Sequence, residues 1–219
     1  MQIKITFRLD SQRSLNLNYN LFLSAVIYKF LNNSDRQFAR FIHDKGYETD
    51  NRQFKLFVFS DLQFKSNGIE NHKIRILPGS ITWLISSSIY DFIKHLVQGL
   101  FILGNDIIID NISFAIEKVE VLQLPEITEK MKFRMLSPLV VSTKTDDGGT
   151  YYYRYTDDFT KPLLQNLKRK YFLITGTESK CNELQLRFDE EYINRNNHKK
   201  NAFSKLRHFQ HYSSSQKKF

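Results

Sequence analysis

The sequence predicts an α+β protein made of two ferredoxin-like (RRM-like) domains in tandem, the second of them incomplete. Short segments that alternate apolar and polar residues, as half-buried strands do, are interleaved with longer segments of helical periodicity. Across residues 1–125 these elements follow the order β, α, β, β, α, β, which is typical of an antiparallel sheet covered by two helices. Residues 126–219 begin the same order but do not complete it.

The first domain opens with a strand and a helical region. Residues 2–9 alternate apolar with polar side chains. Asn20 is predicted to cap a helix that is apolar on most sides, and Ser34 to cap a second, shorter one. Gly46 is a suitable residue to end the second helix, which places His43 in its last turn.

A third helix of this domain is predicted after Pro78-Gly79, with Ser80 as its cap and a span of about 81–100. The turn between the two preceding strands is expected near Asn67-Gly68. The remaining strands are predicted at 54–60, 72–77, 107–109 and 113–123. Pro125 and Glu126 mark the expected domain boundary.

The second domain, 126–219, is predicted from a shorter set of elements. These are a strand-like segment at 130–143, a turn at 146–149, a strand at 151–155, a helix from Asp157 to about Tyr171 and a strand at 182–188. A complete unit needs a further strand, helix and strand, and residues 194–219 offer at most one short helix at 203–209. The missing elements would leave strand edges and an apolar face uncovered.

Charge and cysteine content narrow the function classes. The net charge is +9: residues 1–160 hold 19 Lys and Arg against 18 Asp and Glu, while residues 161–219 hold 13 against 5. Such a basic end suits a polyanion such as RNA, although a solubilising tail has the same composition. The single Cys181 excludes an internal disulfide and a Cys-rich zinc site. With no signal peptide and no membrane-length apolar run, we expect a cytoplasmic protein without a membrane partner.

Tyr28, His43 and Lys55 lie where two short helices are predicted to meet the following strand. RNA cleavage by its own 2′-hydroxyl, without a metal, needs a group that takes a proton, a group that gives one, and a fixed cation. The helix dipole favours a charged imidazole at a helix C-terminus. A phenol with a pKa near 10 is about a thousandfold under-ionised at neutral pH, which makes it a weak base. In such a reaction Tyr28 would serve either as the base or as a group that orients the hydroxyl. Taken singly, each of the three residues also fits a structural role.

The order of three motifs resembles a known family. VIYKFL (26–31), FIHDKGY (41–47) and FKLFVFS (54–60) are similar to the amino-terminal half of the CRISPR-associated Cas-six endoribonucleases, which process repeat RNA in antiviral defence. LSPLVV (136–141) and FTKPLLQNLKRKY (159–171) resemble the start of that family's second half. The resemblance covers most of residues 1–190.

The resemblance implies that Tyr28, His43 and Lys55 are catalytic, in a cleavage that uses no metal or other cofactor and leaves a 2′,3′-cyclic phosphate and a 5′-hydroxyl. Repeat RNA is the implied partner, together with other subunits of a CRISPR effector complex. The family's glycine-rich loop near the carboxy terminus has no counterpart, since the last glycine is Gly176. A shortened member is therefore expected, and a catalytically impaired RNA-binding or scaffold subunit is the alternative function.

Basic side chains near these motifs are the candidate RNA ligands. They are Lys29, Arg52, Lys168, Arg169 and Lys170. The tyrosines of 151–155 could stack on bases or be divided between core and surface. The acidic pairs at 146–147, 157–158 and 190–191 have no histidine at ligand spacing, so no metal site is predicted.

Overall fold

The computed structural model of the chain describes residues 1–128, 130–137, 139–153 and 159–191. The chain divides into two compact units, one formed by residues 1–140 and 166–180, the other by 141–165 and 181–219. The domain limits predicted from the sequence, 1–125 and 126–219, stay a prediction. Within the described ranges, no helix has both the length and the apolar character that crossing a bilayer requires.

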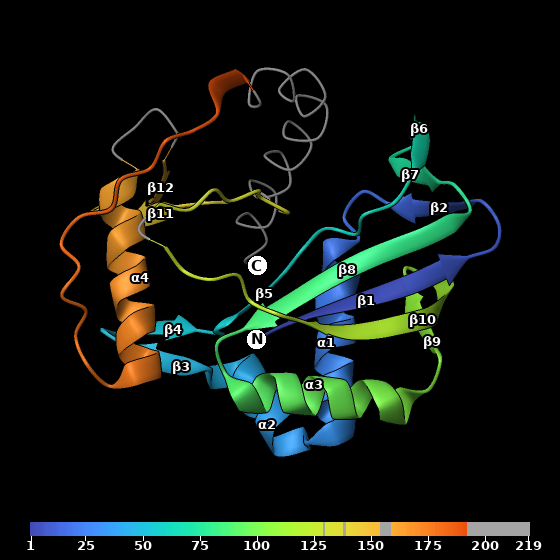
Figure 1. Ribbon diagram of the computed structural model, residues 1–219, viewed down its shortest axis with the longest axis horizontal. Helices are drawn as coiled ribbons and strands as arrows, with labels where there is room; N and C mark the ends of the chain where they lie inside the picture. Colours follow the sequence, from blue (N-terminus) through green and yellow to red (C-terminus); the bar gives the residue numbers. More distant parts are fainter. Residues whose placement is uncertain (129, 138, 154–158, 192–219) are drawn as a thin grey trace. The chain divides into compact units, whose positions relative to one another are not determined.

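The first unit is built on a five-stranded antiparallel sheet with the order β5-β8-β1-β10-β9 (Figure 1). The strands are β1 (Gln2–Leu9), β5 (Phe57–Phe59), β8 (Gly79–Ser87), β9 (Asp106–Ile109) and β10 (Ile112–Leu122). β8 separates β1 from β5, as the ferredoxin-like topology requires, and β9 extends the sheet beyond β10. The α+β, ferredoxin-like prediction is confirmed.

Two helices, α1 (Asn20–Ser34) and α3 (Tyr90–Leu103), pack on each other beside this sheet (Figure 1). Alternate residues of β1, among them Ile5 and Phe7, are fully buried, and Trp83 of β8 is buried opposite Ile5. Burying a large apolar side chain contributes about 1.5–3 kcal/mol relative to leaving it exposed. This core fixes the position of α1, which carries Tyr28.

The helix predicted at 81–100 is wrong over its first third. Residues 79–87 form β8, whose buried positions alternate strictly and include Ile81, Trp83 and Ile85. β8 pairs with β1 on one side and β5 on the other, so both rows of its backbone groups join the sheet. Period-two burial and two-sided pairing outweigh the capping signal of Ser80.

The two predicted helix caps are also wrong. Asn20 donates its amide to Asp61 Oδ1 at 2.9 Å, and no side chain caps α1. Asp35, not Ser34, caps α2 (Arg36–Arg40), because its carboxylate accepts from two backbone N–H groups of that helix. These bonds lower the pKa of Asp35. Ser34 Oγ contacts the Nδ1 of His95 at 2.9 Å instead.

A three-stranded sheet with the order β2-β7-β6 holds β2 (Arg13–Asn16), β6 (Ser66–Glu70) and β7 (Lys73–Ile76). The turn between β6 and β7 falls at Asn71 and His72, both with positive φ, and not at Asn67-Gly68, which lie within β6. β6 is exposed along its length, so its sequence has no alternation of apolar and polar residues that would predict a strand.

The second unit contains a hairpin of β11 (Ser142–Lys144) and β12 (Thr150–Tyr152), joined at the predicted turn. The strands predicted at 130–143 and 182–188 are wrong for the described residues outside β11, which form no strand. Several of their apolar side chains, such as Phe133 and Leu186, are exposed, whereas Val141 is buried. Of the strand predicted at 151–155, Tyr151 and Tyr152 belong to β12 and Tyr153 does not, while residues 154 and 155 lie outside the described residues. Asp157 and the helix predicted at 203–209 lie outside the described residues.

α4 (Thr160–Thr175) crosses from the second unit into the first. It corresponds to the helix predicted to end at about Tyr171, and it continues four residues beyond that point.

Candidate active site

A π-helical turn presents His43. α2 runs directly into η1, a π-helix over Phe41–Lys45, and the Gly46 N–H closes it on the Phe41 carbonyl oxygen at 2.6 Å. π-Turns are uncommon and occur often at functional sites. His43 lies in the last turn before Gly46, as predicted, and its imidazole is exposed.

Gly46 permits a close approach between this turn and β4 (Arg52–Phe54). Its φ is +68°, and an added Cβ would lie 2.7 Å from the Phe54 carbonyl oxygen and 3.3 Å from Lys55 Cδ. Any other residue would meet both a strained backbone and a clash. Glycine at this position therefore brings the His43 turn against the segment that carries Lys55.

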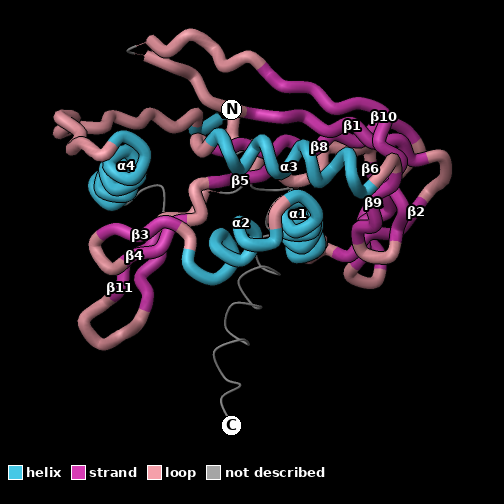
Figure 2. Tube along the Cα trace, turned by 90° about the horizontal axis from the view of Figure 1, so that it is seen from below, coloured by secondary structure: helices cyan, strands magenta, loops and turns pink. Residues whose placement is uncertain are grey.

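Lys55 lies at a corner between two sheets and belongs to no strand, so the single strand predicted at 54–60 is wrong at this point. β3 (Tyr47–Thr49) and β4 form a hairpin that projects from the five-stranded sheet, and the chain returns to that sheet as β5 (Figures 1 and 2). Leu56 turns the corner with φ of +53°. The ammonium of the half-buried Lys55 donates to the His43 carbonyl oxygen.

Tyr28 completes the group from α1. Its ring centroid is 5.0 Å from that of His43, with an interplanar angle of 76°, and 6.2 Å from that of Phe57. Burial raises the pKa of the Tyr28 phenol above its ordinary value. The structure thus brings together Tyr28, His43 and Lys55, which are up to 27 positions apart in the chain.

Asp44 is a member of this group that the sequence reasoning missed. Its Oδ1 lies 2.7 Å from His43 Nδ1. The hydrogen bond from His43 is the largest cause that lowers the pKa of Asp44, and Lys55 and Arg40 contribute with their charges. The adjacent His43 and Asp44 in the sequence could have suggested this pair. That their side chains point toward each other depends on the π-helical turn, which the sequence did not predict. A carboxylate only accepts hydrogen bonds, so Nδ1 is the protonated nitrogen and Nε2 is free to exchange a proton.

The predicted RNA ligands lie on three separate elements. Lys29 on α1 and Arg52 on β4 are exposed. Lys168, Arg169 and Lys170 on α4 are half-buried; Arg169 Nε donates to Asp50 Oδ2 at 2.9 Å, and burial lowers the pKa of Lys170. The charge of Arg169 is therefore partly compensated within the chain.

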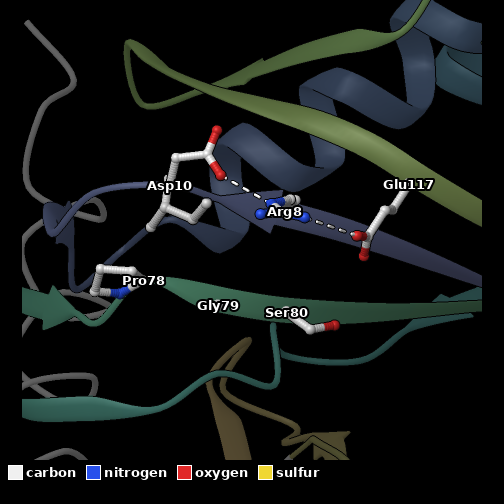
Figure 3. Close-up of a pocket in the computed structure, with 7 residues that line it drawn as sticks. Arg8, Asp10, Pro78, Gly79, Ser80 and Glu117 are labelled. Atoms are coloured by element: carbon white, nitrogen blue, oxygen red, sulfur yellow. Dashed lines mark hydrogen bonds and ion pairs between the residues drawn. The ribbon is translucent and has the colours of Figure 1, made fainter.

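A hollow on the first unit, drawn in Figure 3, is distinct from the group around His43. It is lined mainly by the ends of β1 and β8, where Arg8 donates from Nε to Asp10 at 2.9 Å and lies 3.8 Å from Glu117. These two carboxylates raise the pKa of Arg8 and satisfy its charge. The hollow contains none of the predicted site residues.

Comparison with protein families matches both halves of the chain. Residues 14–120 match the family described as "CRISPR-associated protein Cas6, N-terminal", and residues 122–215 match "CRISPR associated protein Cas6, C-terminal". The chain is 28% identical over 178 residues to CRISPR-associated endoribonuclease Cas6 1 of Methanocaldococcus jannaschii. That match covers 78% of this chain but 65% of the relative, so the chain spans less than two thirds of the relative's length.

Solved structures show the same fold. A structure titled "CRISPR associated protein Cas6" has a TM-score of 0.62 and 26% identity, covering 82% of this chain and 73% of that one. The product of a Cas6-related gene from Pyrococcus furiosus has a TM-score of 0.70 and 23% identity with the same coverage. A protein titled "An RAMP protein binding different RNA substrates" has a TM-score of 0.67 and 22% identity, covering 82% and 74%.

Proposed function

The chain belongs to the Cas6 (Cas-six) family, and on that premise we propose that it binds CRISPR repeat RNA and cleaves it by metal-independent transesterification. The observation that carries the proposal is the convergence of a phenol, an imidazole and an ammonium at one helix end. These groups come from α1, η1 and the β4–β5 corner, so the fold itself sets their positions.

In the proposed reaction, a ribose 2′-oxygen attacks the adjacent phosphorus. A bond forms between that oxygen and phosphorus, and the bond from phosphorus to the 5′-oxygen breaks. The 2′-hydroxyl loses a proton and the leaving 5′-oxygen gains one. The products are a 2′,3′-cyclic phosphate and a 5′-hydroxyl, and no outside nucleophile is consumed.

His43 is the proposed general acid. Its Nδ1 is held by Asp44, so Nε2 of the charged imidazole gives its proton to the 5′-oxygen. The carboxylate of Asp44 fixes the ring orientation and compensates the imidazolium charge, as the carboxylate partner of a catalytic histidine does. Side-chain exposure of His43 leaves the ring accessible to RNA.

Tyr28 is proposed to orient the 2′-hydroxyl rather than act as the base. Because burial raises the pKa of its phenol, Tyr28 is neutral at physiological pH, and a neutral phenol is a weak base. Its oxygen can accept the hydrogen bond of the 2′-hydroxyl and align the attacking atom, and the proton then passes to water.

Lys55 is proposed to stabilise the charge that develops at the phosphorus centre. One of its three N–H donors is used by the His43 carbonyl oxygen, which leaves two for phosphate oxygens. The bond to His43 also keeps the ammonium beside the general acid. Lys29 and Arg52 are proposed to contact the RNA backbone nearby, and the basic residues of α4 to contact it elsewhere.

One assay tests this function: the chain is incubated with hairpin-containing repeat RNA in EDTA, and both binding and product ends are measured. Cleavage that leaves a cyclic phosphate supports the proposal. RNA binding without cleavage identifies an RNA-binding subunit, and the absence of both identifies a scaffold subunit. Cleavage only after a divalent metal is restored would contradict the mechanism.

Asp44→Asn is expected to lower the single-turnover cleavage rate by about tenfold or more, because His43 Nδ1 loses the carboxylate that orients the ring and compensates its charge. RNA affinity should stay the same or increase, because the change removes a negative charge near the phosphates. Glu48→Gln is the control, since it removes an exposed carboxylate from the neighbouring hairpin. Equal rate losses in both variants would exclude a specific role for Asp44.

A further inference from the structure

The corner that carries Lys55 holds a strained backbone. Leu56 is not glycine and has φ of +53°, a left-handed conformation that costs an ordinary residue about 1–2 kcal/mol. It is buried, and together with Lys55 it joins β4 of the hairpin to β5 of the main sheet. Such a conformation persists only when the surroundings fix it.

The side chain of Ser87 supplies that restraint. Ser87 is 4% exposed and is the last residue of β8, opposite Phe57 of β5. Its Oγ donates to the Leu56 carbonyl oxygen at 2.8 Å and accepts from the Ile89 N–H at 3.0 Å. One hydroxyl therefore connects the corner to the start of α3, and its single O–H is donated to the Leu56 carbonyl oxygen.

We propose that Ser87 is a positioning residue for Lys55, holding the left-handed Leu56 so that the ammonium stays beside His43. The two residues are 32 positions apart, and Ser87 touches no reacting atom. The kinetic test of this role rests on the proposed function. The restraint of Leu56 by Ser87 does not, because it follows from the hydrogen bond between them.

Loss of the hydroxyl has a direct physical consequence. In Ser87→Ala, the Leu56 carbonyl and the Ile89 N–H lose their shared partner. The bond to Leu56 is buried and the bond from Ile89 is partly buried, and an unpaired polar group is costly in a buried site. The least expensive relief is for Leu56 to leave the left-handed region, which redirects the preceding residue, Lys55. Displacement of a catalytic group by about 1 Å can cost up to about 100-fold in rate.

Ser60→Ala is the matched control. Ser60 is the other buried serine among the described residues and is also 4% exposed. Its Oγ accepts a hydrogen bond at 3.0 Å from the Leu84 N–H of β8, the strand that ends at Ser87. Ser60 lies at the end of β5 opposite to Leu56. Loss of its hydroxyl therefore weakens the same sheet without releasing Leu56. The two variants should show similar falls in Tm.

The decisive measurement is single-turnover cleavage of repeat RNA by the full chain, well below the Tm of each variant. Ser87→Ala should be about 10- to 100-fold slower with unchanged RNA affinity, and Ser60→Ala should match the wild type. In a Lys55→Ala background, Ser87→Ala should change the rate by less than about twofold, because the two act through one group. A further tenfold loss in that background would overturn the proposal, as would equal losses in the two serine variants.

A second variant and an NMR measurement complete the test. If Ser87→Ala does not fold, Ser87→Cys takes its place, because a thiol keeps the volume and donates only weakly. If the wild-type chain does not cleave RNA, the proposed function fails and NMR decides the positioning. The amide of Asp44 shares a peptide group with the His43 carbonyl, so its signal should shift in Ser87→Ala and Lys55→Ala alike. An unshifted signal in Ser87→Ala would refute the positioning role.

Discussion

His43→Ala is expected to lower single-turnover cleavage of repeat RNA by about 10²–10⁴-fold, the range typical of a general acid. The 5′-oxygen would have to leave without a proton, while Lys55 and the residues proposed to contact RNA remain in place. The Kd for RNA should therefore change little. Measuring the rate and the Kd in the same buffer separates loss of chemistry from loss of binding.

The control for this experiment is His72→Asn. His72 lies in the β6–β7 turn with φ of +60°, a conformation that asparagine tolerates well. The change removes an imidazole from the three-stranded sheet, outside the candidate site. Its cleavage rate should equal that of the wild type. If His43→Ala cleaves within about tenfold of the wild type, His43 is not the acid.

Gly99→Ala is expected to destabilise the first unit by about 2 kcal/mol or more, the scale of overpacking in a core. Gly99 lies where α3 crosses α1, and an added Cβ would lie 1.7 Å from the Phe30 carbonyl oxygen and 2.5 Å from its carbon. The atom it meets is backbone, so the helices themselves must separate. Because Phe30 follows Tyr28 by two residues on α1, the same shift should also lower the cleavage rate.

Denaturant unfolding measures this effect, and the sign of the change is the test. Helix propensity alone favours alanine over glycine by about 1 kcal/mol, so an uncrowded site would be stabilised. Lys94→Ala, at an exposed position on α3, should stay within about 0.5 kcal/mol of the wild type. A Gly99→Ala variant as stable as the wild type would show that α1 and α3 do not approach this closely.

Much of the first unit was predictable because its local patterns agree with its tertiary contacts. The alternation of β1 and the end of the helical region at Gly46 follow from side-chain periodicity and glycine chemistry. The segment of β8 was predicted as a helix because Leu84 interrupts the polar face of the strand, so that its apolar residues also fit a helical pattern. Its pairing on both sides, invisible in the sequence, decided the outcome.

The sequence predicted that Tyr28, His43 and Lys55 come together, but not which contacts hold them there, and their catalytic roles stay a prediction. Tyr28, His43 and Lys55 were identified from motif order, and the structure brings them together. The π-turn, the left-handed Leu56 and the hydroxyl of Ser87 depend on contacts between distant segments. Propensities describe neighbouring residues only, so such supports appear once the fold is known.

The most direct test of the proposed chemistry is cleavage of a repeat RNA with a single 2′-deoxyribose immediately 5′ of the scissile phosphate. The mechanism uses that 2′-oxygen as its only nucleophile. It predicts that the modified RNA binds with unchanged affinity and is not cut, while the unmodified RNA yields a 2′,3′-cyclic phosphate in EDTA. Cleavage of the deoxy-substituted RNA at the same position would contradict attack by the 2′-hydroxyl.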